Sequence, residues 1–335
     1  MRARRRQVGR RCGSIEHDGG MDLLADALRV SGARGSLGTR VEAGGRWGLW
    51  LDTFPGVALH AVTAGTLWLT VPGTGPRRMD AGDAVLLPAG TEHGLASEPG
   101  VMMGACDRER ADRTRAIGGV LQLGSSPPQT TLVTLHYEHD PEVSTPVLTA
   151  LEGPVHVAAS ERTYLDDTVR LLTRELAHPQ IGTTAAVNSI IDLLLIQFVR
   201  AWLATQPVQR PSSWLGALLD PVVRDALEHI HREPDHGWTT STLAAAIRVS
   251  RATLSRRFPA ALGQTPGAYL TAWRIDIAAA RLRDTDDTVE AVATAVGYTS
   301  QHAFSRAFRR ARGVAPSEFR ADVRAAAHIG RRLPA

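Results

Sequence analysis

Lysine is absent from the 335-residue sequence, so all 38 basic residues are arginine, a compositional bias from which we derive no function. The two cysteines, Cys12 and Cys106, stand in no CxxC or other metal-ligand spacing. This excludes a disulfide framework and a zinc finger, and it predicts a reducing, cytoplasmic setting. No run of about eighteen residues is both apolar and free of charge, so we expect neither a membrane span nor a membrane partner.

Charge is distributed unevenly along the chain. Residues 21–212 carry 15 arginines and 20 acidic residues, whereas residues 213–335 carry 17 arginines and 12 acidic residues. An acidic body followed by a basic region favours a C-terminal part that binds a polyanion. Residues 1–20 hold six arginines and lack the apolar segment of a secretory signal, so we predict a disordered basic extension. The alternative is that translation begins at Met21, with Asp22 near the start of a helix.

The first half of the chain has the pattern of a small β-domain. Between residues 49 and 103, short apolar runs alternate with glycine and proline, and residues 67–71, 84–87 and 130–137 predict strands. This spacing is typical of an antiparallel barrel or sandwich. We expect residues 106–119, which are dense in charge and lack apolar periodicity, to form a mobile loop.

Two helices are predicted next, over residues 161–178 and 185–203, and the second is too apolar for a single solvated face. They could pack on the barrel, on each other or on a second subunit, so a homodimer is one of three options. The polar, proline-rich residues 206–213 predict a linker. The predicted organisation is a domain over residues 21–205, this linker, a second domain over 214–324 and a tail over 325–335.

The C-terminal part begins with a pattern of short helices. Residues 221–232 predict an amphipathic helix, and the polar residues 239–242 precede a small apolar segment at 243–247. After a turn at 248–250, a basic helix begins at Arg251. A short helix, a tight turn and a second helix with a basic exposed face are the arrangement of a helix-turn-helix.

The same pattern recurs further along the chain. Residues 289–296 are again small and apolar, residues 297–300 predict a turn with glycine at a positive φ, and residues 301–312 predict the second basic helix. Residues 254–258 and 304–308 share an apolar-Ser-Arg-x-Phe sequence. The unit is therefore an internal repeat.

A single helix is predicted between the two units, over residues 266–283, with Pro266 in its first turn. Its length of ~27 Å could set the two units on successive major grooves, which lie ~34 Å apart. The aromatic residues that we expect in the core rather than against bases are Phe258, Trp273, Tyr298 and Phe308.

The second unit carries a specific signature, G-Y-x-S-Q-x-x-F-S-R-x-F-R-R from residue 297, followed by G-V-A-P-S-E-F-R from residue 313. With these residues, the C-terminal part of the chain resembles the AraC/XylS family of bacterial transcription regulators. The resemblance implies sequence-specific binding to double-stranded DNA, contact with RNA polymerase and no enzymatic activity.

The resemblance also implies which side chains meet DNA. Base-reading side chains would be Ala252, Ser255 and Arg256 in the first unit, and Gln301, His302, Ser305 and Arg306 in the second. Arg256 and Arg306 suit guanine, which they can contact through O6 and N7, and Gln301 suits adenine. Phosphate contacts would come from Arg251, Arg257, Arg309 and Arg310.

The first unit departs from the family at two places. Arg248 stands where the family usually has a glycine in the turn, so we expect either a strained turn or an added phosphate contact. Pro259 is expected to end the basic helix early. Both features predict that the first unit discriminates bases less than the second.

The N-terminal half contains G-D-x-x-x-x-P-x-G-x-x-H from residue 82 to His93, preceded by Pro55-Gly56 and His60. These residues resemble the motifs of the cupin barrel, and more closely the ligand-binding cupin of AraC-family regulators. The resemblance implies an α+β chain of two domains, a cupin-like antiparallel β-barrel with packed helices and an all-α double helix-turn-helix. It also implies a small-molecule effector in the barrel, in a pocket near His60 and His93.

A metal site is not favoured. Catalytic cupins usually present a second histidine and a glutamate in the first motif, but this chain has Val62 at that place and no glutamate at the usual spacing. Two imidazoles without a carboxylate are a poor iron or manganese site, so we predict no metal and no cofactor. His60 and His93 are then pocket groups or satisfied core histidines, with a two-histidine zinc or copper site as the alternative.

Two other functions are compatible with the sequence. One is a metal-dependent cupin enzyme, such as an oxygenase, with a DNA-binding appendage. The other is an N-terminal part that only oligomerises and binds no ligand.

Overall fold

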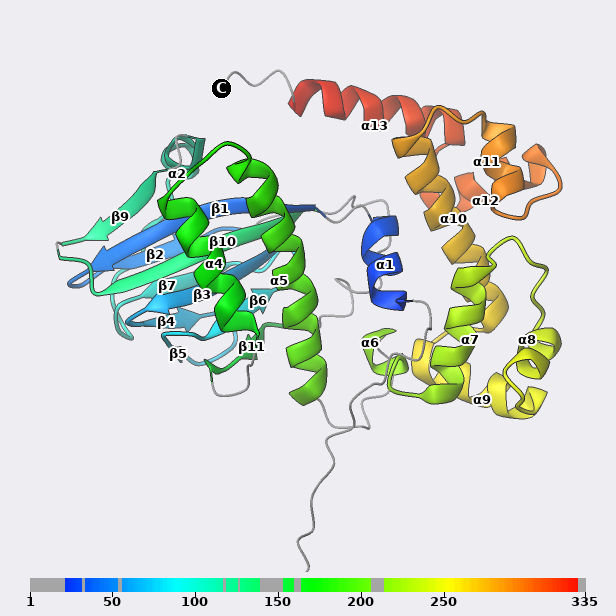
Figure 1. Ribbon diagram of the computed structural model, residues 1–335, viewed down its shortest axis with the longest axis horizontal. Helices are drawn as coiled ribbons and strands as arrows, with labels where there is room; N and C mark the ends of the chain where they lie inside the picture. The colour runs from blue at the N-terminus through cyan, green and yellow to red at the C-terminus, as the bar shows by residue number, and fades with distance from the viewer. Residues whose placement is uncertain are drawn as a thin grey trace, which may run out of the picture.

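The computed structural model describes residues 22–31, 34–53, 56–116, 119–125, 127–138, 153–159, 164–205 and 214–330. It shows a β-rich N-terminal domain with helices and an all-helical C-terminal domain (Figure 1). The predicted α+β class with two domains is confirmed. The predicted extension over residues 1–20, Met21 and the predicted linker over 206–213 lie outside the described residues.

The N-terminal strands form two sheets. The strands are β1 (Arg34–Gly44), β2 (Gly48–Leu51), β3 (Val57–Ala64), β4 (Thr66–Thr70), β5 (Arg77–Asp80), β6 (Ala84–Leu87), β7 (His93–Ala96), β8 (Gly104–Ala105), β9 (Val120–Gly124), β10 (Thr130–Glu138) and β11 (Val155–Val157). One sheet has the order β11-β6-β3-β10-β1-β9 and the other β5-β4-β7-β2-β8. In β4, Leu67 and Leu69 are buried while their neighbours are partly exposed, the alternation of a strand with one face on a core.

A core of apolar side chains lies between the two sheets, with Val62, Leu95 and Leu132 among its members. Most neighbouring strands are antiparallel, as predicted, but β9 pairs with β1 and β8 pairs with β2 in parallel. The chain passes directly from β8 to β9 through the helix α2 (Arg108–Ala116). This helix therefore connects the five-stranded sheet, which contains β8, to the six-stranded sheet, which contains β9.

The prediction of a mobile loop over residues 106–119 is wrong, because α2 occupies most of this segment. The helix has no apolar stripe. It starts where the Asp107 carboxylate accepts the backbone N–H of Arg110 at 2.9 Å, and Glu109 and Arg113 form an ion pair of 3.0 Å one turn apart. These local contacts stabilise a helix without apolar periodicity. α2 packs against β1 and β9 (Figure 1).

Two helices, α4 (Leu165–Ala177) and α5 (Thr183–Thr205), cover the outer face of the six-stranded sheet and confirm the helices predicted for this part of the chain. Tyr137 of β10 is fully buried and donates its hydroxyl hydrogen to the Ile191 carbonyl oxygen of α5 at 2.8 Å. By length and composition alone, α5 could cross a membrane. It contains Asp192 and Arg200, and its apolar side chains such as Phe198 are buried on the sheet, so we assign it to the core of this domain.

The C-terminal helices are α6 (Trp214–Ala217), α7 (Pro221–Arg232), α8 (Thr240–Ala246), α9 (Arg251–Leu262), α10 (Pro266–Asp284), α11 (Val289–Ala295), α12 (Gln301–Arg312) and α13 (Pro316–Gly330). The pairs α8–α9 and α11–α12 each combine a 7-residue helix with a 12-residue helix, which confirms the repeat. α10 joins the two units, since Tyr269 and Trp273 belong to the core of the first and Ala278 and Leu282 to that of the second.

Two helix ends differ from the prediction. α9 continues through Pro259 to Leu262, where Gly263 caps it with a φ of 69°. Pro259 removes only one N–H donor, and Leu262 packs against the core and holds the last turn in place. α13 extends to Gly330, so the predicted tail from residue 325 is helical over its first residues.

The first helix packs on the C-terminal domain although the sequence places it with the barrel. Asp22 precedes α1 (Leu23–Ser31), and its carboxylate accepts the Ala25 N–H in the first turn at 3.1 Å. The buried Ala27 and Val30 of α1 share one apolar cluster with Trp273 of α10, and the helix lies against α7 and α10 (Figure 1). Because the same cluster includes α5 and the outer face of the six-stranded sheet, the two domains share a continuous core.

Candidate nucleic-acid interface and barrel cavity

The backbone of each helix-turn-helix bends at one residue with a positive φ. Gly297 follows α11 with a φ of 81°, and a Cβ atom there would lie 2.6 Å from the Asp235 Cα, so glycine is required. Arg248 takes the equivalent place after α8 with a φ of 57°, the one positive φ of a non-glycine residue in the described part of the chain. A side chain disfavours this conformation, so the expected strain is present in the first turn.

The helices α9 and α12, called the recognition helices, start and end in the same way. The Ser250 hydroxyl accepts the Thr253 N–H at 3.0 Å, and the Ser300 hydroxyl accepts the Ala303 N–H at 3.4 Å. Each helix ends at a glycine in the left-handed conformation. Equal caps and equal lengths make corresponding residues of the two helices point to corresponding sides.

Apolar anchors decide which side of each recognition helix faces outward. Leu254 and Phe258 of α9 are fully buried, and so are Phe304 and Phe308 of α12. The predicted base-reading residues that are exposed are Ala252, Ser255, Arg256, Gln301, His302 and Arg306, while Ser305 is half-buried. The aromatic residues predicted for the core are buried or half-buried, namely Phe258, Trp273, Tyr298 and Phe308.

Most predicted DNA-contacting arginines are free for a partner, but one is not. Among the predicted DNA contacts, the exposed arginines that form no ion pair with any residue of the described ranges are Arg251, Arg256, Arg306, Arg309 and Arg310. Arg257 is half-buried, and its Nε donates to the Asp220 carboxylate at 2.9 Å. Asp220 caps α7, so this ion pair holds α9 against α7. A phosphate contact by Arg257 stays a prediction that competes with this structural role.

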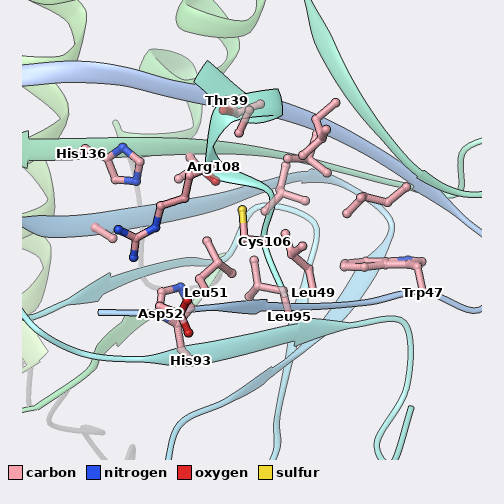
Figure 2. Close-up of a pocket in the computed structure, with 17 residues that line it drawn as sticks. Thr39, Trp47, Leu49, Leu51, Asp52, His93, Leu95, Cys106, Arg108 and His136 are labelled. Carbon is pink, nitrogen blue, oxygen red and sulfur yellow. The ribbon is translucent and has the colours of Figure 1, made fainter. Parts of the chain in front are cut away.

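A cavity of about 320 Å³ lies between the two sheets of the barrel. Side chains from both sheets and from α2 converge on it (Figure 2). Its apolar lining includes Trp47, Leu49, Leu95, Leu121 and Leu132, and its polar lining includes Asp52, His93, Arg108 and His136. Of the two histidines predicted for a pocket, His93 borders this cavity, whereas His60 is fully buried beside it.

His60 and His93 connect the two sheets through a hydrogen-bond relay. The two Nε2 atoms lie 2.8 Å apart, His60 Nδ1 lies 2.9 Å from the Thr134 hydroxyl, and His93 Nδ1 lies 3.0 Å from the Thr91 carbonyl oxygen. Since a carbonyl only accepts, His93 carries its hydrogen on Nδ1 and accepts at Nε2 from His60. His60 then accepts from Thr134, and all four ring nitrogens are satisfied with both rings neutral.

These histidines do not fit the iron or manganese of a catalytic cupin. The relay uses both Nε2 atoms, and no cluster of three or more His, Cys, Asp or Glu side chains able to hold a metal ion occurs among the described residues. Two imidazoles leave a facial triad incomplete. The arrangement therefore favours satisfied core histidines over metal ligands.

The relay predicts that acid destabilises the barrel. Burial lowers the pKa of His60 well below its ordinary value, with His93 and His136 adding to this, and burial also lowers the pKa of His93. Below about pH 6.5 these two histidines therefore bind protons in the unfolded chain but not in the folded barrel. The free energy of unfolding decreases as the pH falls. Each unit of depression is worth about 1.4 kcal/mol. We expect urea unfolding to show a lower free energy at about pH 5 than at about pH 7.5.

Other buried groups titrate too, so the test is a difference between variants. Wild type and His60→Gln are compared at both pH values, with His178→Gln, an exposed histidine on the end of α4, as the matched control. On acidification, the free energy of unfolding should decrease less for His60→Gln than for wild type. For His178→Gln it should decrease as much as for wild type. Equal losses in all three proteins would contradict the relay.

The sequence did not identify most of the cavity. Arg108 belongs to the helix that was expected to be a loop, and Asp52 and His136 stand in no motif. A local signal for α2 exists in Asp107 and in the Glu109–Arg113 spacing. No local signal could bring Asp52, Arg108 and His136 together, because they come from the residue after β2, from α2 and from β10.

Comparisons with known proteins agree with both halves of the chain. Residues 22–204 match a family described as Cupin, and residues 243–322 match one described as Helix-turn-helix domain. A putative AraC-like transcription regulator of Streptomyces antibioticus is 33% identical over 90% of this chain and 98% of its own length. One of Streptomyces lividans is 34% identical, also over 90% of this chain and 98% of its own length. The solved DNA-binding domain of AdpA with a target DNA is 31% identical, covers 35% of this chain and 99% of that chain, and has a TM-score of 0.30.

Proposed function

The chain belongs to the AraC family of transcription regulators, and from this premise we propose how its two domains divide the work. It binds DNA through the C-terminal double helix-turn-helix, and like its curated relatives it is a regulator rather than an enzyme. In the proposal, α9 and α12 enter successive major grooves, and a small-molecule effector in the barrel controls this binding.

The proposal for DNA recognition depends on one observation, the equivalent exposed faces of the two recognition helices. Arg256 and Arg306 occupy the same place on α9 and α12, each two residues from a buried anchor on either side and therefore on the opposite face of its helix. They read guanine and Gln301 reads adenine. The remaining base-reading positions are Ala252, Ser255, His302 and Ser305, and phosphate contacts come from Arg251, Arg257, Arg309 and Arg310.

The cavity supports an effector and disfavours a barrel that only oligomerises. Its volume of about 320 Å³ falls at the lower end of small-molecule sites. The continuous core from the six-stranded sheet through α5 and α1 to α7 and α10 supplies contact between the barrel and the first unit. An effector that binds one arrangement of the domains better needs a coupling of only about 1–3 kcal/mol to change promoter affinity.

We also propose a cellular compartment and two protein partners, a second copy of the chain and RNA polymerase. The protein works in the cytoplasm, where its DNA is. It forms a homodimer through the outer surface of α4 and α5, on which Leu171 and Leu193 are exposed. It contacts RNA polymerase when it is bound at a promoter.

The experiment that tests this function measures binding of the purified protein to its own upstream intergenic DNA and to scrambled DNA over a salt series. We expect a preference of at least about a thousandfold for the upstream DNA at physiological salt. Arg309→Ala should weaken binding to both DNAs alike and reduce the salt slope by about one. Arg77→Ala, an exposed arginine of β5, is the matched control and should change neither. Equal binding of both DNAs by wild type would contradict the proposed function.

A further inference from the structure

We propose that the barrel cavity binds a small organic acid, with the carboxylate held by Arg108 and an apolar body among the leucines and Trp47. This inference rests on the proposed effector role of the barrel and names the chemical class of the effector. Two features of the cavity support this proposal, namely its apolar interior and the single cationic side chain at one end.

The interior of the cavity suits an apolar body. Leu95 and Leu132, which belong to different sheets, are almost fully buried and face the same space. Trp47 closes the end of the cavity that lies opposite Arg108 (Figure 2). A chain or ring placed here removes its apolar surface from water, worth about 25 cal/mol per Å².

The polar end of the cavity has one side chain with a fixed positive charge. The Arg108 guanidinium extends from α2 toward the cavity, where Asp52, His93 and His136 also gather (Figure 2). Its Nη2 donates to the Thr53 carbonyl oxygen at 2.7 Å, which fixes the direction of the group. Within the described residues, Arg108 forms no ion pair with a carboxylate, although Asp52 lines the same cavity.

A carboxylate satisfies this arrangement better than other head groups. The planar guanidinium offers five N–H donors in a fork that matches a carboxylate, and the single bond to Thr53 leaves most of them for a ligand. His93 contributes no charge, because its ring is part of the neutral relay with His60. An ammonium head group would pair with Asp52 and be repelled by the guanidinium, whereas a carboxylate would pair with Arg108 and be repelled by Asp52. The fork of N–H donors on the guanidinium, which can hold both carboxylate oxygens, favours the carboxylate.

Binding of three probes with one alkyl chain tests this proposal. Octanoate, octanol and octylamine differ only in the head group, and isothermal titration calorimetry measures their affinities for the full-length protein. A charge-assisted hydrogen bond predicts that octanoate binds about 10- to 100-fold tighter than octanol. Arg108→Gln should remove this preference and leave octanol binding unchanged.

Two variants on α2 make the result specific to the cavity. Arg110→Gln is the matched control, since Arg110 is an exposed neighbour on the same helix and does not line the cavity, and it should keep the preference. Ala111→Trp fills the cavity and should abolish binding of every probe. Octylamine as the tightest probe, or octanol equal to octanoate, would overturn the carboxylate proposal while the effector role stands. Absence of binding by all three probes would overturn both, whereas DNA binding is measured separately.

Discussion

Replacing Arg312 with alanine is expected to lower the free energy of unfolding by about 3–5 kcal/mol at about pH 8. Arg312 at the end of α12 forms an ion pair with Asp276 of α10, and the two side chains are only 8% and 9% exposed. The pair joins the second recognition helix to the helix that connects both units. Removing the arginine leaves a buried carboxylate without a partner, which costs far more than the loss of an exposed ion pair.

The size of this effect should depend on pH. Burial raises the pKa of Asp276 to about 7, although Arg312 acts in the opposite direction. In the unfolded chain the pKa returns to about 3.9, so the stability lost to this group grows as the pH rises from about 4 toward 7. Without Arg312 the pKa of Asp276 in the folded protein is higher still. The cost of this group to the free energy of unfolding then continues to grow above about pH 7. The variant should therefore differ from wild type more at about pH 8 than at about pH 6.

Urea unfolding of three variants separates the ion pair from other effects. Arg309→Ala, an exposed arginine on the same helix, should change the free energy of unfolding by at most about 0.5 kcal/mol. Removing both partners, Asp276→Ala with Arg312→Ala, should be less harmful than Arg312→Ala alone, because no buried charge is left unpaired. An Arg312→Ala variant as stable as wild type at both pH values would refute this account.

Replacing Arg306 with alanine is expected to weaken promoter binding by about 1–3 kcal/mol, or ~5- to 150-fold, and to relax sequence preference at one or two base pairs. Arg306 is exposed on α12 and has no ion pair within the described residues, while Phe304 and Phe308 hold the helix in place. When a side chain that reads a base is removed, the protein binds less tightly only to sequences that contain that base. Affinities for a set of single base-pair variants of the promoter site measure this directly.

The comparison with Arg310→Ala makes the prediction specific. Arg310 is exposed on the same helix and is predicted to contact phosphate, so its loss should weaken binding to all variants of the site by a similar factor. If Arg306→Ala also weakened all sites equally, Arg306 would be a phosphate contact and the assignment of the base-reading face would be wrong.

The double helix-turn-helix was predictable because its signals are local. The spacing of Phe304 and Phe308, the serine caps at positions 250 and 300 and the glycine at 297 all lie within a few residues of the feature that they determine. For the same reason, the bounds of α7 and α12 agree with the sequence prediction residue for residue. Pro259 misled because its local effect, one missing donor, is smaller than the packing of Leu262 on a distant core.

The barrel site was less predictable because it is assembled from distant residues. The motif identified His60 and His93, but their relay needs Thr134, which lies 74 residues from His60 along the chain. Arg108 reaches the cavity from a helix without an apolar stripe. The place of α1 is likewise a tertiary effect, since nothing in residues 22–31 indicates that the helix packs on α10 rather than on the barrel.

The most direct test of the central claim is a dimethyl sulfate protection footprint of the protein on its upstream intergenic DNA, because this reagent methylates guanine N7 in the major groove. Two recognition helices joined by the 19-residue α10 should protect two major grooves on one face of the duplex. Their centres should lie one turn, about 10 to 10.5 base pairs, apart. An insertion of about 5 base pairs between the protected grooves turns them to opposite faces and should abolish specific binding. Protection of a single groove, or specific binding that survives the insertion, would contradict the claim that both units read DNA together.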